Sequence, residues 1–219
     1  MKKVLLMGLL GIVGLMGFVG CQEKPSDGKC HIYGTVADKN LEGKRIFLVP
    51  FTGPATAETV DSMEVTNGKF EFTPDSMQMY KILMDYHFRM GTETLLVIAE
   101  PGVLEVIIDS VSSAKGTPQN DSLQAWKELT QEQGKKRGQI NKKIKELNLQ
   151  GDFKTADELK KESHESYIAY KKRSRQMAAN MKGTILGDFL KGMFPLTYKR
   201  KMPDGKVVEL DADTDEPVK

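Results

Sequence analysis

The chain contains few of the residues that build redox and metal centres. Its 219 residues include two cysteines, three histidines and one tryptophan. No Cys-x-x-Cys occurs, so the chain has no dithiol redox centre of its own. His31, His87 and His164 lie far apart in the sequence and lack the spacing of metal ligands. We therefore expect no metal and no cofactor.

Common catalytic motifs are also lacking. The sequence has no glycine-rich phosphate loop, no Gly-x-Ser-x-Gly elbow and no HExxH. The segment "ESHES" (Glu162–Ser166) holds Ser, His and Glu, but neighbours in a helix point in different directions and cannot form a triad. We expect no catalytic residues and a protein that is not an enzyme.

The first twenty residues have the form of a secretory signal. Lys2 and Lys3 precede 17 uncharged residues, 4–20. Five glycines lower the hydrophobicity of this run, and a membrane-spanning helix needs roughly 17–25 apolar residues. A permanent membrane span is the weaker alternative, and we predict a signal peptide over residues 1–20.

The signal ends in "FVGC" (Phe18–Cys21), which resembles the lipobox of bacterial lipoproteins, although Phe18 stands where Leu is commoner. In that family the chain is cut between the residues that correspond to Gly20 and Cys21. The cysteine sulfur then carries a thioether-linked diacylglycerol, and acyl chains such as palmitate hold the protein to a membrane. The alternative is an ordinary signal peptide with an incidental cysteine.

This resemblance implies a protein anchored by lipid in the cell envelope of a bacterium. We expect the outer membrane, on its periplasmic or surface face. Residues 21–29 contain Pro, Ser, Asp and Gly and are predicted to be a flexible tether. Outside the cytoplasm the chain would rarely meet nucleic acid, so we expect none as a partner.

Acylation of Cys21 would leave Cys30 as a single thiol that cannot pair with it. Cys30 stands beside His31 at the start of an apolar stretch, which favours burial. The alternative is a redox thiol that forms a mixed disulfide with a thioredoxin-like partner, which requires accessibility and a lowered pKa.

The rest of the chain has two parts of different charge. Residues 31–117 hold 7 Lys and Arg against 12 Asp and Glu, whereas residues 118–192 hold 16 against 10. In residues 30–117, short apolar stretches alternate with turn signals such as Asn67-Gly68 and Pro101-Gly102. This pattern predicts an antiparallel, sandwich-like β domain of about seven strands.

Residues 118–195 have the composition and apolar spacing of helices. Asn120 or Asp121 could cap a first helix, Gly151-Asp152 interrupts the pattern, and a second long helix follows. A third, short helix is expected over Leu186–Phe194. We predict a helical hairpin, hence an α+β fold, and a charged, disordered tail over residues 196–219.

Several motifs together resemble domain of unknown function 4369, the N-terminal accessory domain of thioredoxin-like lipoproteins from Bacteroidetes-type bacteria. They are Asp61-Ser62, Asn67-Gly68-Lys69-Phe70, Glu100-Pro101-Gly102, and Gly116-Thr117 with Asn120. Family members usually continue into helices and then a thioredoxin-like module with Cys-x-x-Cys. That module is not in this sequence, so the resemblance does not imply thiol–disulfide oxidoreductase activity here.

Basic clusters lie in both predicted long helices, for example at Lys142–Lys145 and Lys171–Arg175. They could meet anionic phospholipid or lipopolysaccharide, but glutamates on the same helices favour ordinary solvated faces. We expect a non-enzymatic binding or accessory module with a membrane anchor and an envelope protein as its partner. The alternative is a member of an envelope thiol–disulfide pathway that acts through Cys30.

Overall fold

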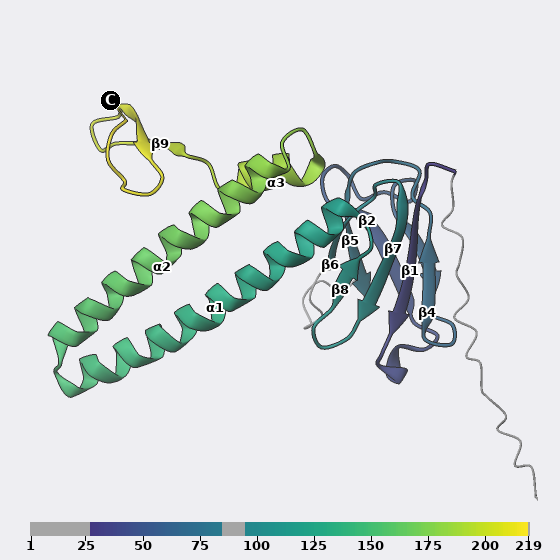
Figure 1. Ribbon diagram of the computed structural model, residues 1–219, viewed down its shortest axis with the longest axis horizontal. Helices are drawn as coiled ribbons and strands as arrows, with labels where there is room; N and C mark the ends of the chain where they lie inside the picture. The colour runs from purple at the N-terminus through teal and green to yellow at the C-terminus, as the bar shows by residue number, and fades with distance from the viewer. Residues whose placement is uncertain (1–26, 85–94, 219) are drawn as a thin grey trace, which may run out of the picture.

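The computed structural model describes residues 27–84 and 95–218. Figure 1 shows a β domain from which a long helical hairpin projects to one side. A short helix and a β hairpin follow along the chain. The predicted α+β class and the sandwich-like arrangement are confirmed.

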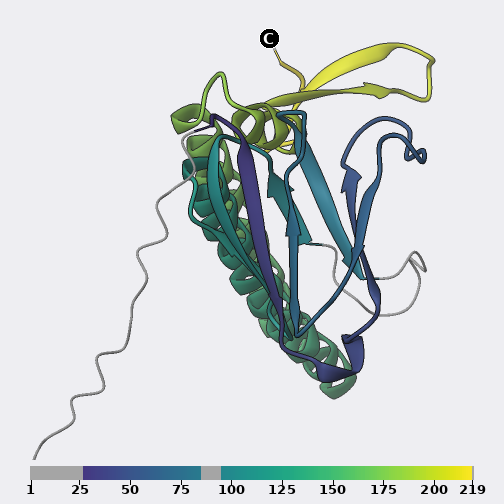
Figure 2. The same ribbon diagram turned by 90° about the vertical axis from the view of Figure 1, so that its right-hand side faces the viewer.

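The β domain consists of two four-stranded sheets. The first has the order β4 (Lys69–Phe72), β1 (Cys30–Val36), β7 (Gly102–Ile108) and β8 (Ser113–Lys115). Figure 2 shows this sheet from the side of β1 and β4. The predicted antiparallel domain is corrected in one respect, because β1 and β7 are parallel.

The second sheet has the order β3 (Asp61–Glu64), β2 (Arg45–Pro50), β5 (Met79–Met84) and β6 (Leu95–Ile98). A single 3-10 turn, Lys39–Leu41, separates β1 from β2. All pairs in this sheet are antiparallel. The described residues between 30 and 115 therefore form eight strands rather than about seven.

The two sheets enclose the larger apolar core. Its fully buried side chains include Ile32, Ile46, Ile82, Val97 and Leu104. The strands β5 and β6 are apolar almost throughout, because one face packs against the first sheet and the other against helices.

The Asn67-Gly68 turn has the backbone conformation that the sequence predicts. Both residues have positive φ, 53° and 66°. The turn does not close a simple hairpin, however, because β3 before it and β4 after it lie in different sheets. The Glu42 carboxylate accepts hydrogen bonds from the N–H groups of Asn67 (2.6 Å) and Gly68 (2.8 Å), which holds this corner.

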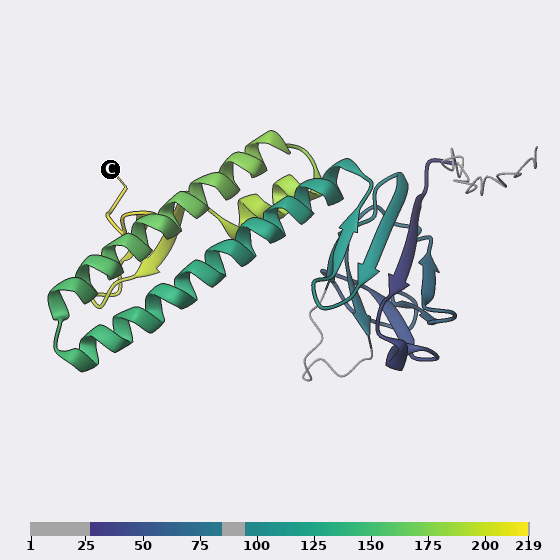
Figure 3. The same ribbon diagram turned by 60° about the horizontal axis from the view of Figure 1, so that its bottom comes forward.

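The helical hairpin consists of α1 (Pro118–Gln150) and α2 (Phe153–Asn180), joined at Gly151 in the left-handed conformation. Figure 3 shows the two helices side by side along their length. The helix α1 begins earlier than the predicted cap at Asn120 or Asp121, with Thr117 as N-cap and Pro118 in its first turn. The predicted short helix is confirmed as α3 (Ile185–Met193).

Buried polar side chains join the β domain to the helices. Asn120 hydrogen-bonds both backbone groups of Ile98 in the edge strand β6. The Glu100 carboxylate accepts from the backbone N–H of Gln119 at 2.6 Å, at the N-terminus of α1 where a negative charge is favoured. The Gln119 side chain also accepts from the N–H of Leu186 in α3. A second apolar cluster around Trp126 and Leu190 completes this junction.

The prediction of a disordered tail is corrected. Residues 197–211 form an antiparallel pair, β9 (Thr197–Lys201) and β10 (Val207–Asp211). Arg175 of α2 donates two hydrogen bonds to the Asp213 carboxylate, at 2.7 and 3.0 Å, and Lys171 lies 2.8 Å from the same group. These contacts hold the pair against α2, and they depend on residues about 40 positions apart that the tail composition does not reveal.

Candidate functional site

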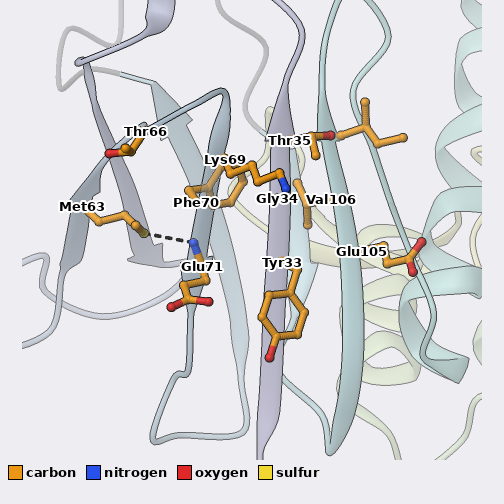
Figure 4. Close-up of a pocket in the computed structure, with 11 residues that line it drawn as sticks. Tyr33, Gly34, Thr35, Met63, Thr66, Lys69, Phe70, Glu71, Glu105 and Val106 are labelled. Carbon is orange, nitrogen blue, oxygen red and sulfur yellow. Dashed lines mark hydrogen bonds between the residues drawn. The ribbon is translucent and has the colours of Figure 1, made fainter. Parts of the chain in front are cut away.

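A shallow hollow lies on the outer face of the first sheet. Its volume is about 560 Å³, and strands β1, β4 and β7 form most of its floor, with Met63 of β3 at one edge. Figure 4 shows the side chains that line it. Because side chains alternate along a strand, Tyr33 and Thr35 point outward here while Ile32 and Val36 point into the core.

The strand register arranges the outward residues of the hollow in two rows. Tyr33 lies opposite Glu71 on β4 and opposite Glu105 on β7, so the tyrosine stands between two glutamates. In the next row Thr35 lies between Lys69 and Ile107. Figure 4 shows Glu71, Tyr33 and Glu105 on three adjacent strands.

The chemistry of the first row suits a cationic group. Tyr33 is 37% exposed and its ring is stacked with His31, with ring centroids 6.4 Å apart. A tyrosine face attracts Lys or Arg side chains, and carboxylates on both sides provide charge-assisted hydrogen bonds. Ile107 is 46% exposed and adds apolar surface beside the row. Lys69 also lines the hollow, so the lining carries two negative side chains and one positive one. The hollow can therefore accept a basic side chain beside Tyr33 together with neighbouring apolar groups.

The edge of the sheet beside the hollow is closed to strand addition. The backbone N–H of Glu71 donates to the Met63 sulfur at 3.0 Å. In the turn that precedes β4, the backbone groups of Thr66 and Lys69 hydrogen-bond each other. A ligand would therefore contact the face of the sheet rather than extend it.

The predicted redox thiol Cys30 is not part of this hollow. It is free and 5% exposed, in the core between the sheets. Burial raises its pKa from 9.0 to about 11; a hydrogen bond from the Glu100 backbone opposes this shift, and the Glu100 charge adds to it. A buried thiol with a raised pKa disfavours thiol exchange.

The other predicted site residues, Gly20 and Cys21, lie outside the described residues. Within residues 27–84 and 95–218, no three or more His, Cys, Asp or Glu side chains are grouped to hold a metal ion. Among the helices of the described part of the chain, none combines the length and apolar character that crossing a membrane requires.

Most of the family motifs named above build the fold, and only Lys69 and Phe70 among them line the hollow. Glu100 and Asn120 join β6 to α1, and Gly116 has a φ of 118°, where an added Cβ would lie 2.6 Å from the Val103 carbonyl oxygen. Sequence reasoning missed the row around Tyr33. Alternation along β1 could have shown that Tyr33 faces outward, but only the long-range pairing places two glutamates beside it.

Comparison with protein families matches residues 30–123 to a domain of unknown function (DUF4369). The matched region ends within the first two turns of α1, so it includes the Glu100–Gln119 and Asn120–Ile98 contacts. Comparisons with curated proteins and with solved structures find no match.

Proposed function

We propose that this protein, whose residues 30–123 match a DUF4369 domain, is a lipid-anchored envelope protein. We propose further that it acts as a non-enzymatic binding module. Two sequence features support the anchor, the uncharged run that ends in "FVGC" and the polar tether that follows. The observation that carries the binding role is the row Glu71–Tyr33–Glu105 in the open hollow. Its partner would be an envelope protein that presents a basic segment.

The anchor is tested on the mature protein. Mass spectrometry of its N-terminus is expected to show a chain that begins at Cys21 and carries diacylglycerol and acyl groups. Cys21→Ser should release the protein from the membrane fraction or leave it unprocessed, whereas Cys30→Ser should remain anchored. An unmodified Cys21 thiol in the native protein would refute the anchor.

The binding role is tested with a photo-crosslinking amino acid at Tyr33 in the anchored protein. Tyr167 is the matched control, because it is a tyrosine of nearly equal exposure (38% against 37%) on α2. A defined adduct should form several-fold more from position 33 than from position 167. It should weaken in a Glu105→Gln background and persist in a Glu64→Gln background, since Glu64 is an exposed glutamate outside the row.

Equal crosslinking from both tyrosines would contradict the binding role. The proposal also predicts no disulfide reductase or hydrolase turnover by the purified protein, and robust turnover in either assay would overturn it. Cys30-dependent adducts with a partner would favour the thiol pathway instead.

A further inference from the structure

The chain after α3 forms a small unit that is hydrogen-bonded within itself. We name residues 197–218, which contain β9 and β10, the strap. Beyond β10 the chain turns back, and the N–H of Val218 donates to the carbonyl oxygen of Glu209 at 3.0 Å. The Tyr198 hydroxyl donates to the Asp215 carboxylate, also inside the strap. Figures 1 and 3 show this unit beside α2 and away from the two sheets.

Few contacts hold the strap to the helices. Every hydrogen bond and ion pair that the described residues show between the strap and the helices involves Lys171 or Arg175 of α2. Within β9 and β10, Leu210 is the single buried side chain. A two-stranded pair is marginally stable by itself. The position of the strap therefore depends largely on two basic side chains.

Opposite charges meet at this contact. Residues 171–175 hold four Lys and Arg and no acidic residue, whereas residues 211–216 hold four Asp and Glu and no basic one. Arg175 donates to both oxygens of the Asp213 carboxylate, at 2.7 and 3.0 Å, and Lys171 lies 2.8 Å from it. Part of the basic cluster of α2 is thus occupied by an acidic segment of the same chain.

Groups outside the strap orient both basic side chains. The Arg175 guanidinium also donates to the carbonyl oxygens of Phe194 (3.1 Å) and Pro195 (2.9 Å), which precede the strap. The Lys171 ammonium lies 5.4 Å from the centre of the Tyr167 ring, one turn earlier on α2. Both side chains would therefore keep their orientation if the strap moved away. Such preorganised cations bind a carboxylate at little cost in ordering.

The site binds a backbone group as well as a charge. Lys171 donates to the backbone carbonyl oxygen of Ala212, next to Asp213. The two acceptors are thus a side-chain carboxylate and the carbonyl of the preceding residue, which any peptide with an acidic residue supplies together. The planar fork of Arg175 matches the carboxylate. These features favour an acidic segment of a protein over a lone anion.

We propose that Lys171 and Arg175 form a binding site for an acidic segment of another protein, and that the strap covers this site as an internal competitor through Asp213. The partner displaces the strap by placing its own Asp or Glu against Arg175. Because strap and site belong to one chain, the competitor has a high effective concentration. The apparent affinity for the partner is then reduced to the fraction of molecules whose strap is open. This site is separate from the hollow around Tyr33, so neither proposal requires the other.

The experiment titrates a fluorescent peptide with the sequence of residues 209–218, "ELDADTDEPV", at low salt, since salt screens exposed charges. Asp213→Asn in the protein weakens the strap, so this variant should bind the peptide at least about tenfold more tightly than the unmodified protein does. Asp204→Asn is the matched control, because Asp204 is an exposed strap residue in the turn between β9 and β10. It should bind as the unmodified protein does.

A second change identifies the site. Adding Lys171→Gln to Asp213→Asn should weaken peptide binding about fivefold or more, because a hydrogen bond from a charged group is lost. Adding Lys142→Gln instead should leave binding unchanged, since Lys142 is exposed on α1. In the unmodified protein, saturating peptide should accelerate hydrogen exchange at Leu210 as the strap is displaced.

Three results would overturn the proposal. They are equal affinity of the unmodified and Asp213→Asn proteins, no binding by either, and binding that Lys171→Gln leaves unchanged. Peptide that binds the unmodified protein without accelerating exchange at Leu210 would show that the strap is not its competitor.

Discussion

The side-chain amide of Asn120 pairs with the backbone of Ile98 as a neighbouring strand would, donating to the carbonyl oxygen at 2.7 Å and accepting from the N–H at 2.8 Å. Asn120 belongs to α1, and Ile98 to the edge strand β6 of the second sheet. One buried side chain thus satisfies two backbone groups that would otherwise lie unpaired beneath a helix.

Asn120→Ala should therefore be strongly destabilising. It leaves the N–H and C=O of Ile98 buried without partners, and each such group costs about 1–3 kcal/mol, so we expect a loss of about 2–6 kcal/mol in the free energy of unfolding. Urea unfolding followed by circular dichroism measures it. The control Asn148→Ala, at an exposed position of α1, should change stability by less than about 0.5 kcal/mol. Equal effects would show that the amide pairing contributes little.

Gly34 in β1 is predicted to tolerate no side chain while Phe70 is present. A Cβ at Gly34 would lie 1.9 Å from the Phe70 ring, and Phe70 is buried on the neighbouring strand. Gly34→Ala should cost about 1–3 kcal/mol through overpacking. Adding Phe70→Leu to Gly34→Ala should recover part of that loss, although Phe70→Leu alone destabilises. A double-mutant cycle measures this coupling, and simple additivity of the two changes would contradict the close contact.

The β9–β10 pair should detach from α2 in acid. The Arg175 guanidinium and the Lys171 ammonium hold the pKa of Asp213 at about 2, below its usual 3.8. Because the folded-state pKa is lowered, the stabilisation is complete above about pH 4 and is lost as the pH falls toward 2. Hydrogen exchange of Leu210, which is buried on β10, should accelerate over that range.

Asp213→Asn tests the same contact at neutral pH. It removes the negative charge that both Arg175 and Lys171 contact. Hydrogen exchange at Leu210 should therefore already be faster at pH 7, and it should no longer accelerate as the pH falls from 4 to 2. Asp204→Asn is the control, since Asp204 lies in the exposed turn between β9 and β10. If exchange at Leu210 in Asp213→Asn still accelerates between pH 4 and 2 as in the unmodified protein, a group other than Asp213 causes that acceleration.

Cys30 should react slowly with thiol reagents in the native protein. A pKa of about 11 instead of 9.0 lowers the thiolate fraction at neutral pH about a hundredfold, and burial blocks access as well. Labelling by an aromatic disulfide reagent should thus follow unfolding and become fast in denaturant. Rapid labelling of the native protein would restore Cys30 as a candidate for thiol exchange.

Local signals in the sequence predict much of this fold, whereas contacts between distant segments do not follow from them. Asn67-Gly68 forms its turn because both residues tolerate positive φ, which depends on neighbours alone. The β9–β10 turn carries a comparable signal in Pro203-Asp204-Gly205, with a positive φ at Gly205, but its docking depends on Arg175 far away. The row around Tyr33 likewise requires the pairing of β1 with β7, about 70 residues later.

The parallel pairing of β1 with β7 also determines the order in which this domain can form. The strand β1 lies between β4 and β7, so both of its neighbours are synthesised after it, and β7 only once more than 100 residues exist. Such late, non-local partners slow folding and leave an apolar strand unpaired in the nascent chain. Until β7 arrives, β1 is open to pairing with other chains, so a protein that keeps nascent chains apart would benefit its biogenesis.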